Sequence, residues 1–146
     1  MRSRLIIALL ATGAAMTGCD LETVEAQPFE SGVRQLTDQG AFNVALHSAG
    51  GTPRPGHNDF ILEIAMPDPN DPQALGRGIP DARVNVTAVM PAAQGVASEA
   101  EFVRFMGNGR YLVSDLNLPH SGVWEVDVDI EVGSTMDEQV TFAFEL

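Results

Sequence analysis

From residue 41 onward, apolar residues recur at every second position in short runs that turn residues separate. This period of two is typical of β-strands that bury one face and expose the other. The clearest run, residues 124–132, places Trp, Val and Ile on one face and Asp and Glu on the other. Its register is tightly specified, because a slip by one residue would bury four carboxylates. Seven runs predict strands at 42–46, 60–66, 84–88, 102–106, 111–113, 124–132 and 140–146.

Seven short strands over roughly 105 residues predict an all-β fold, an immunoglobulin-like antiparallel β-sandwich. Fibronectin-type or transthyretin-type strand orders would give the same pattern, so the strand order stays open. We expect Trp124 to be the central core residue, and we expect Met66 and Met106 to be buried because they continue apolar alternations. Gly, Asn and Gly at 107–109 predict a tight turn between two strands.

The first 18 residues have the order of a secretory signal, with Arg2 and Arg4 before an apolar stretch at 5–15. Eleven helical residues reach about 16 Å, half of a hydrocarbon core, so this stretch is too short to span a membrane. The only cysteine, Cys19, follows small residues, and this arrangement resembles a lipobox. We therefore expect cleavage before Cys19 and a lipid on its thiol. The alternative, a free thiol left by an ordinary signal, is disfavoured in an oxidising compartment.

These features predict three parts: a signal peptide at 1–18, a lipidated N-terminus with a flexible tether at 19–38, and a folded domain at 39–146. The tether is predicted from its many acidic residues and its lack of any hydrophobic period. The protein is then expected in the cell envelope, lipid-anchored and facing the periplasm. Asp20 resembles the signal that retains lipoproteins in the inner membrane, which favours that membrane over the outer one.

The chain contains eight arginines, no lysine and twenty acidic residues, which give a net charge of −12. Removal of the signal would leave six arginines against twenty acids, a net charge of −14. Such a surface repels phosphate backbones, so we expect no nucleic-acid partner. It also repels anionic headgroups, so membrane attachment is expected to depend on acyl chains, each buried methylene contributing about 0.8 kcal/mol. An envelope protein partner is expected, but its identity cannot be derived from the sequence.

Five short landmarks follow one another along the chain: GHNDF at 56–60, IPDARV at 79–84, MP at 90–91, GRY at 109–111 and GVWEV at 122–126. Their order and spacing resemble the YtkA-like domain, a small envelope sandwich related to the FixH proteins associated with cbb3-type oxidase assembly. The resemblance implies an Ig-like fold on the outer side of a membrane, in a copper or respiratory setting. In the family, Met-Pro is commonly followed by further methionine and histidine, whereas this chain continues with Ala-Ala-Gln-Gly. A family metal site is therefore not carried over directly.

Met90 and His120 are the predicted metal ligands. Met90 ends a strand and His120 lies in the loop at 117–121, and two such loops can meet at one end of a sandwich. A thioether and an imidazole suit Cu(I), so copper is the expected metal. The alternative is that Met90 fills a gap in the core and His120 is an exposed loop residue. The acidic row at 125–131 is expected to be solvated, because carboxylates on one strand lie too far apart to surround an ion.

No motif for catalysis is present: the chain has no Gly-x-Ser-x-Gly elbow, no phosphate-binding glycine loop and no His-Glu-x-x-His sequence. We therefore expect a protein that is not an enzyme. The leading hypothesis is a membrane-anchored envelope lipoprotein that assists copper handling or respiratory oxidase assembly. The alternative is a metal-free protein–protein interaction module of an envelope complex.

Overall fold

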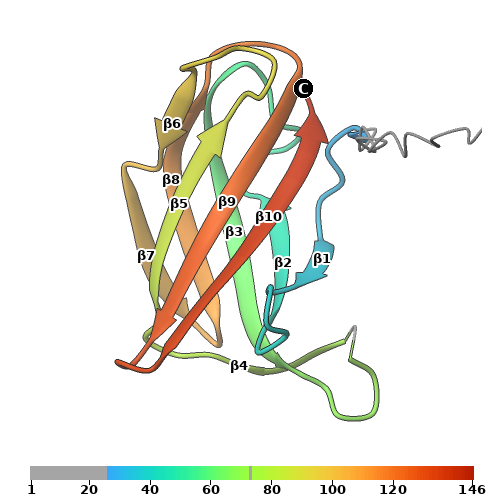
Figure 1. Cartoon of the computed structure of the whole chain (residues 1–146), viewed down its shortest axis with the longest axis vertical. Coiled ribbons are helices and arrows are strands. Elements are labelled where there is room, and N and C mark those ends of the chain that lie inside the picture. The colour runs from blue at the N-terminus through green and yellow to red at the C-terminus, as the bar shows by residue number, and fades with distance from the viewer. Residues whose placement is uncertain (1–25, 73) are drawn as a thin grey trace, which may run out of the picture.

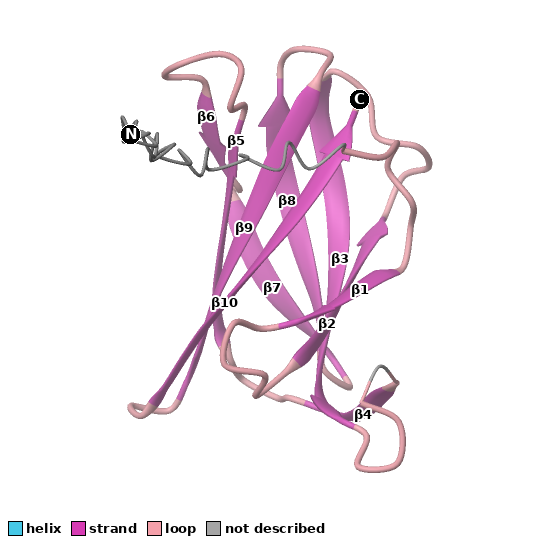
Figure 2. Ribbon diagram, turned by 45° about the vertical axis from the view of Figure 1, so that its right-hand side comes forward, coloured by secondary structure: helices cyan, strands magenta, loops and turns pink. Residues whose placement is uncertain are grey.

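The computed structural model describes residues 26–72 and 74–146, which form two antiparallel β-sheets packed face to face (Figure 1). The predicted all-β, immunoglobulin-like sandwich is confirmed, and the described part of the chain is strand and loop without helix (Figure 2). Accordingly, no helix within these ranges is long and apolar enough to cross a membrane. The predicted signal peptide and Cys19 lie outside the described residues.

The two sheets contain ten strands rather than the seven that were predicted. The three additional strands, β1, β4 and β6, have only three or four residues each, too few for a period of two to be visible. The six-stranded sheet has the order β1 (Val33–Leu36), β2 (Asn43–Ser48), β3 (Gly56–Pro67), β8 (Arg110–Leu118) and β7 (Phe102–Gly107), and β4 (Leu75–Gly78) pairs with β3. The four-stranded sheet has the order β10 (Met136–Glu145), β9 (Val123–Val132), β5 (Arg83–Val89) and β6 (Ala97–Glu99).

Trp124 is a core residue, as predicted, and its side chain is fully buried between the sheets near the start of β9. Burial alternates along β9, so Val126, Val128 and Ile130 follow Trp124 into the core and the carboxylates between them face outward. β9 pairs with β10 over ten consecutive residues and with β5 over seven. This long pairing fixes the register that the sequence pattern predicted.

Tyr111 links the two sheets through the segment that crosses between them. Its hydroxyl donates to the backbone carbonyl of Ile79 at 2.8 Å and accepts from the backbone N–H of Ala82 at 2.9 Å. Burial raises the pKa of the Tyr111 phenol, the hydrogen bond from Ala82 opposes this, and the charge of Asp81 adds to the rise. The crossing segment is therefore held by a group that stays protonated over the ordinary pH range.

Met66 and Met106 are not core residues, which corrects the prediction from their alternating patterns: 44% and 49% of their surfaces are exposed. The pairing of β3 with β4 shifts register between Ala65 and Pro67, so Ala65 is buried and Met66 points outward. A bulge reverses the phase of a strand, so the period of two cannot be continued past it. Met106 instead shares the exposed face of β7 with Phe102 and Arg104, because Val103 and Phe105 are the residues that pair with the buried Val113 and Tyr111.

Part of the predicted tether is folded against the sandwich, so the boundary at residue 38 is placed too late. β1, at Val33–Leu36, pairs with β2. Before it, the ring of Phe29 packs 5.8 Å from that of Phe60 and 5.0 Å from that of Phe144. The backbone N–H of Glu145 also donates to the carbonyl of Gln27 at 2.9 Å. A single aromatic residue and a four-residue strand leave no period in the sequence, which is why the segment was interpreted as linker.

Candidate functional site

The predicted metal ligands lie at one end of the sandwich, which we call the site end and define by residues 56–57, 90–96 and 119–122. The strand register brings these three segments together. Gly56 pairs with Leu118, the last residue of β8, and Val89, the last residue of β5, pairs with Glu125 near the start of β9. The loops after β5 and β8 therefore lie beside the start of β3 (Figure 1).

Met90 is half-buried and packs against the core from the loop that joins β5 to β6. Its backbone N–H donates to Val96 at 3.2 Å and its carbonyl accepts from Ala93 at 3.0 Å, which fixes the position of the residue. Its side chain extends over Gly122, because a Cβ added to that glycine would lie only 2.5 Å from the Met90 methyl carbon. Gly122 has φ +128°, a backbone conformation that favours glycine at this position.

His120 is exposed, two residues before the glycine that Met90 covers. Its backbone carbonyl accepts from the indole N–H of Trp124 at 2.9 Å. Gly122 and Leu146 exchange backbone hydrogen bonds of 3.0 and 3.1 Å, which join this loop to the end of β10. The loops of Met90 and His120 are therefore adjacent, and the His120 side chain is exposed. Coordination of a metal by this pair stays a prediction.

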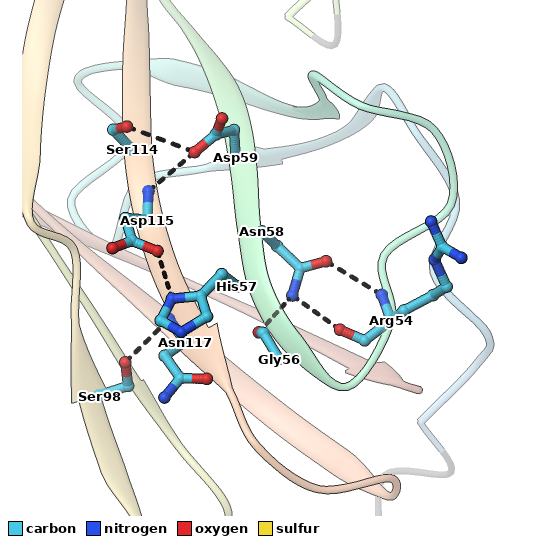
Figure 3. A network of polar contacts seen from close by, with 9 residues as sticks. All are labelled: Arg54, Gly56, His57, Asn58, Asp59, Ser98, Ser114, Asp115 and Asn117. Atoms are coloured by element: carbon cyan, nitrogen blue, oxygen red, sulfur yellow. Dashed lines mark hydrogen bonds and ion pairs between the residues drawn. The ribbon is translucent and has the colours of Figure 1, made fainter.

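A second histidine, His57, lies at the site end, although its place in the sequence predicts no ligand role. Figure 3 shows its Nδ1 in contact with Oδ1 of Asp115 from the neighbouring strand β8. The side chains are 68% and 41% exposed, so the pair lies at the surface. A carboxylate that holds Nδ1–H leaves the Nε2 lone pair directed outward, the arrangement found where imidazoles bind metals. The two residues are 58 positions apart, so spacing alone could not have paired them.

Hydrogen bonds fix the backbone around Asp115 and so position its carboxylate. Asp115 has φ +57°, a conformation uncommon for residues other than glycine. The Asp59 carboxylate accepts from the Asp115 N–H at 2.8 Å and from the Ser114 hydroxyl at 3.3 Å (Figure 3). The pairing of β3 with β8 shifts register between Asn58 and Phe60, opposite this position. Left-handed residues and bulges are frequent at functional sites, and both occur here.

The site end has a limited set of metal-binding groups. Among residues 26–72 and 74–146, no three His, Cys, Asp or Glu side chains converge as a metal cluster. The soft or imidazole donors that this end carries are the Met90 thioether and the side chains of His120 and His57. This donor set is soft to intermediate and fits Cu(I) better than it fits calcium or magnesium.

The acidic row of β9 faces outward, as predicted, and its members have different partners. Glu131 forms an ion pair with Arg83 at 2.9 Å, and Asp127 accepts from the Thr141 hydroxyl. The pKa of Asp129 is raised, first by desolvation and then by the negative charges of Asp127 and Asp137. A hydrogen bond from Asn85 opposes this rise. The row is thus an outward-facing strand surface on which neighbouring carboxylates repel one another.

Comparisons with known proteins support the fold but do not identify a family. No family model matches the chain, and no curated protein matches it. The chain is similar in structure to a copper-bound variant of FetP from uropathogenic Escherichia coli, with a TM-score of 0.51 and 15% sequence identity. The match covers 80% of this chain and 97% of that one. At this identity the likeness shows the fold, and the predicted YtkA-like resemblance stays a prediction.

Proposed function

We propose that this protein is a lipid-anchored envelope protein with a YtkA-like sandwich that handles copper at its site end, without catalysis. Cys19 would hold the lipid. Met90, His120 and His57 would supply the copper ligands, and bound copper would be passed to or received from an envelope partner. The observation that carries this proposal is the contact of the Met90 side chain with Gly122, which brings a thioether next to the loop of His120.

Two further features support copper as the ligand. The structural neighbour FetP is copper-bound. The outward Nε2 of His57, fixed by Asp115, adds an oriented imidazole at the same end of the sandwich. Thioether and imidazole ligands select Cu(I) over hard cations. Respiratory oxidase assembly is the more specific version of this function, and it rests on the sequence resemblance alone.

A Cu(I) competition titration tests the proposal. The full chain should carry Cys19→Ala, because a free thiol is itself a soft ligand that would bind Cu(I). We expect tight 1:1 binding that is lost when Met90→Leu and His120→Ala are combined, and weakened by His57→Ala. The control combines Met136→Leu and His47→Ala, which removes the same groups elsewhere: Met136 is exposed, and His47 is paired with Glu63. Equal affinity in both double variants would refute this site.

The lipid anchor has its own test. Cys19→Ala should release the protein from membranes or block its processing, because acyl chains rather than a basic surface are expected to hold it. Fractionation of cells and mass spectrometry of the purified chain give the two readouts. Unchanged membrane association together with an unmodified Cys19 in the native protein would refute the anchor.

The alternative function, a metal-free interaction module, is favoured by the distribution of charge over the two sheets. The strands of the four-stranded sheet carry one arginine against eight acids, a formal −7, and those of the six-stranded sheet carry four arginines against three acids, a formal +1. Two faces of different charge could bind different partners. In the copper titration, the absence of tight binding would favour this alternative.

A further inference from the structure

An apolar slot opens on the side of the sandwich between the edge strands β1 and β10. It has a volume of about 310 Å³ and lies outside the site end. Its floor is made by core side chains, those of Leu46 and Phe142, and Phe144 lines it beside them. Val33 and Gln35 of β1 line the opposite wall. A predominantly apolar opening that reaches core residues is the usual form of a site for an apolar ligand.

The N-terminal segment lines this slot and contacts β10 on either side of it. At one end residues 26–30 form a wall, held by the hydrogen bond from Glu145 to Gln27 and by the ring of Phe29. At the other end the backbone N–H of Asp38 donates to the carbonyl of Gln139 at 2.9 Å. Between these two contacts the segment leaves the edge of β10 to pair with β2. The opening is too confined for an added β-strand, which would have to run out of both ends.

The size and polarity of the slot fit part of an alkyl chain. An engineered apolar cavity of roughly 150 Å³ holds benzene, so a slot of twice that volume takes about a dozen carbon atoms. Glu30 lines the slot, and the chain has a net charge of −12. An anionic head group, such as that of a free fatty acid, would therefore be repelled. The expected ligand is a neutral acyl chain, esterified or amide-linked.

The position of the slot indicates where such a chain would come from. Its wall begins at Ala26, the first described residue, and Cys19 lies seven residues earlier in the sequence. Seven residues span at most about 25 Å, so a lipid on Cys19 would be held at a high effective concentration beside the slot. The free energy of transferring a methylene from water is about as favourable into a bilayer as into an apolar pocket. The slot would therefore fill when the protein is out of the membrane.

We propose that this slot holds the end of one acyl chain of the lipid on Cys19 whenever the protein is not inserted in a bilayer. The inference rests on the lipid anchor of the proposed function and is independent of copper. It assigns the folded N-terminal segment a role: this segment forms one wall of the site that covers the protein's own lipid when the protein is outside a bilayer.

Photo-crosslinking of the lipidated full chain tests this inference. Cells that produce the protein are supplied with a fatty acid that carries a diazirine near its methyl end, so that the probe enters the lipid on Cys19. The purified protein is freed of detergent, irradiated and digested, and crosslinked peptides are identified by mass spectrometry. We expect crosslinks to residues 26–35 and 142–144, and we expect them to disappear when the same protein is inserted in vesicles.

Two matched variants on β1 separate the slot from the rest of the strand. Val33→Trp fills the slot and should reduce these crosslinks about 15-fold, since about two methylenes would no longer fit. Leu36→Trp lies on the same short strand at a position that does not line the slot, and should leave them unchanged. Both native side chains are exposed, so both variants should fold, which thermal unfolding verifies.

The outcomes distinguish the two proposals. Probe on Cys19 with crosslinks confined to the slot supports the inference. Probe on Cys19 with crosslinks elsewhere, or with crosslinks that Val33→Trp does not reduce, overturns the inference and leaves the anchor standing. Absence of any probe on Cys19 refutes the anchor, and the inference falls with it.

Discussion

At the scale of single residues, side chains that hydrogen-bond to the backbone hold the parts of this sandwich that the sheets do not. Tyr111 binds the crossing segment at Ile79 and Ala82, and Asp59 fixes the unusual backbone of Asp115. Trp124 binds the loop of His120 in the same way. The candidate ligands are thus positioned by buried or paired residues nearby, while their own side chains stay accessible.

Tyr111→Phe should lower the free energy of unfolding by about 1–3 kcal/mol at pH 7, because the carbonyl of Ile79 and the N–H of Ala82 lose their partner. The raised pKa of Tyr111 adds a pH dependence. Above pH 10 the unfolded phenol ionises before the folded one, so native stability falls and the difference from the variant shrinks. Urea denaturation at pH 7 and pH 10.5 measures both effects; a constant difference would contradict the role of burial.

Asp129→Asn should raise stability at neutral pH by about 0.2–1 kcal/mol, because it removes a carboxylate that is desolvated and lies near Asp127 and Asp137. A raised folded pKa means that the ionised form costs stability, and this cost disappears as the pH falls through that pKa. The advantage of the variant should therefore vanish near pH 3. Thermal unfolding at the two pH values tests this, with the exposed Glu101→Gln as control.

The sequence was sufficient to predict burial where apolar and polar residues alternate regularly. It was insufficient where this alternation is interrupted. Trp124 and the carboxylates of β9 were placed correctly because ten residues of β9 keep one phase. Met66 was misplaced because a register shift lies beside it, and Met106 because the outward face of β7 is itself partly apolar. The pair of His57 and Asp115 could not be found, since it depends on which strands are neighbours.

At the scale of elements, the N-terminal segment belongs to the folded domain. It packs Phe29 between two core rings, adds β1 to the six-stranded sheet and contacts β10 at both ends of the slot. Seven strands were visible in the sequence because each has an apolar face. The strands of three or four residues were not, because they are stabilised by pairing with a neighbour rather than by burial.

Phe29→Ala should lower the free energy of unfolding by about 2–3 kcal/mol, somewhat less than for a fully buried ring, because Phe29 is partly buried against Phe60 and Phe144. A residue of a flexible tether would show no effect. Chemical denaturation of the full chain measures the change, and Glu30→Ala, at an exposed neighbouring position, serves as the control. If the two variants were equally stable, this segment would be a linker and not part of the folded domain.

At the scale of the whole molecule, the two sheets differ in charge, with the acids concentrated on the strands of the four-stranded sheet. Raising NaCl from about 20 mM to about 0.5 M should therefore stabilise the fold by about 1 kcal/mol, since the Debye length becomes shorter than the spacing of these carboxylates. The gain should be smaller when Glu125→Gln and Asp129→Asn are combined. Thermal unfolding at both salt concentrations measures it, and a salt-independent midpoint would contradict this source of strain.

In a protein anchored through Cys19, the contact between Gln27 and Glu145 would also determine which way the molecule faces. It places the start of the folded chain next to the end of β10, beside the loop that carries His120 (Figure 1). In a protein held at Cys19, a connection of seven residues would keep this end close to the headgroups. The hairpin at residues 133–135, at the opposite end of the sandwich, would then face away from the bilayer. A partner that reaches His120 would therefore approach along the membrane surface, as an integral membrane protein does, rather than from the open periplasm.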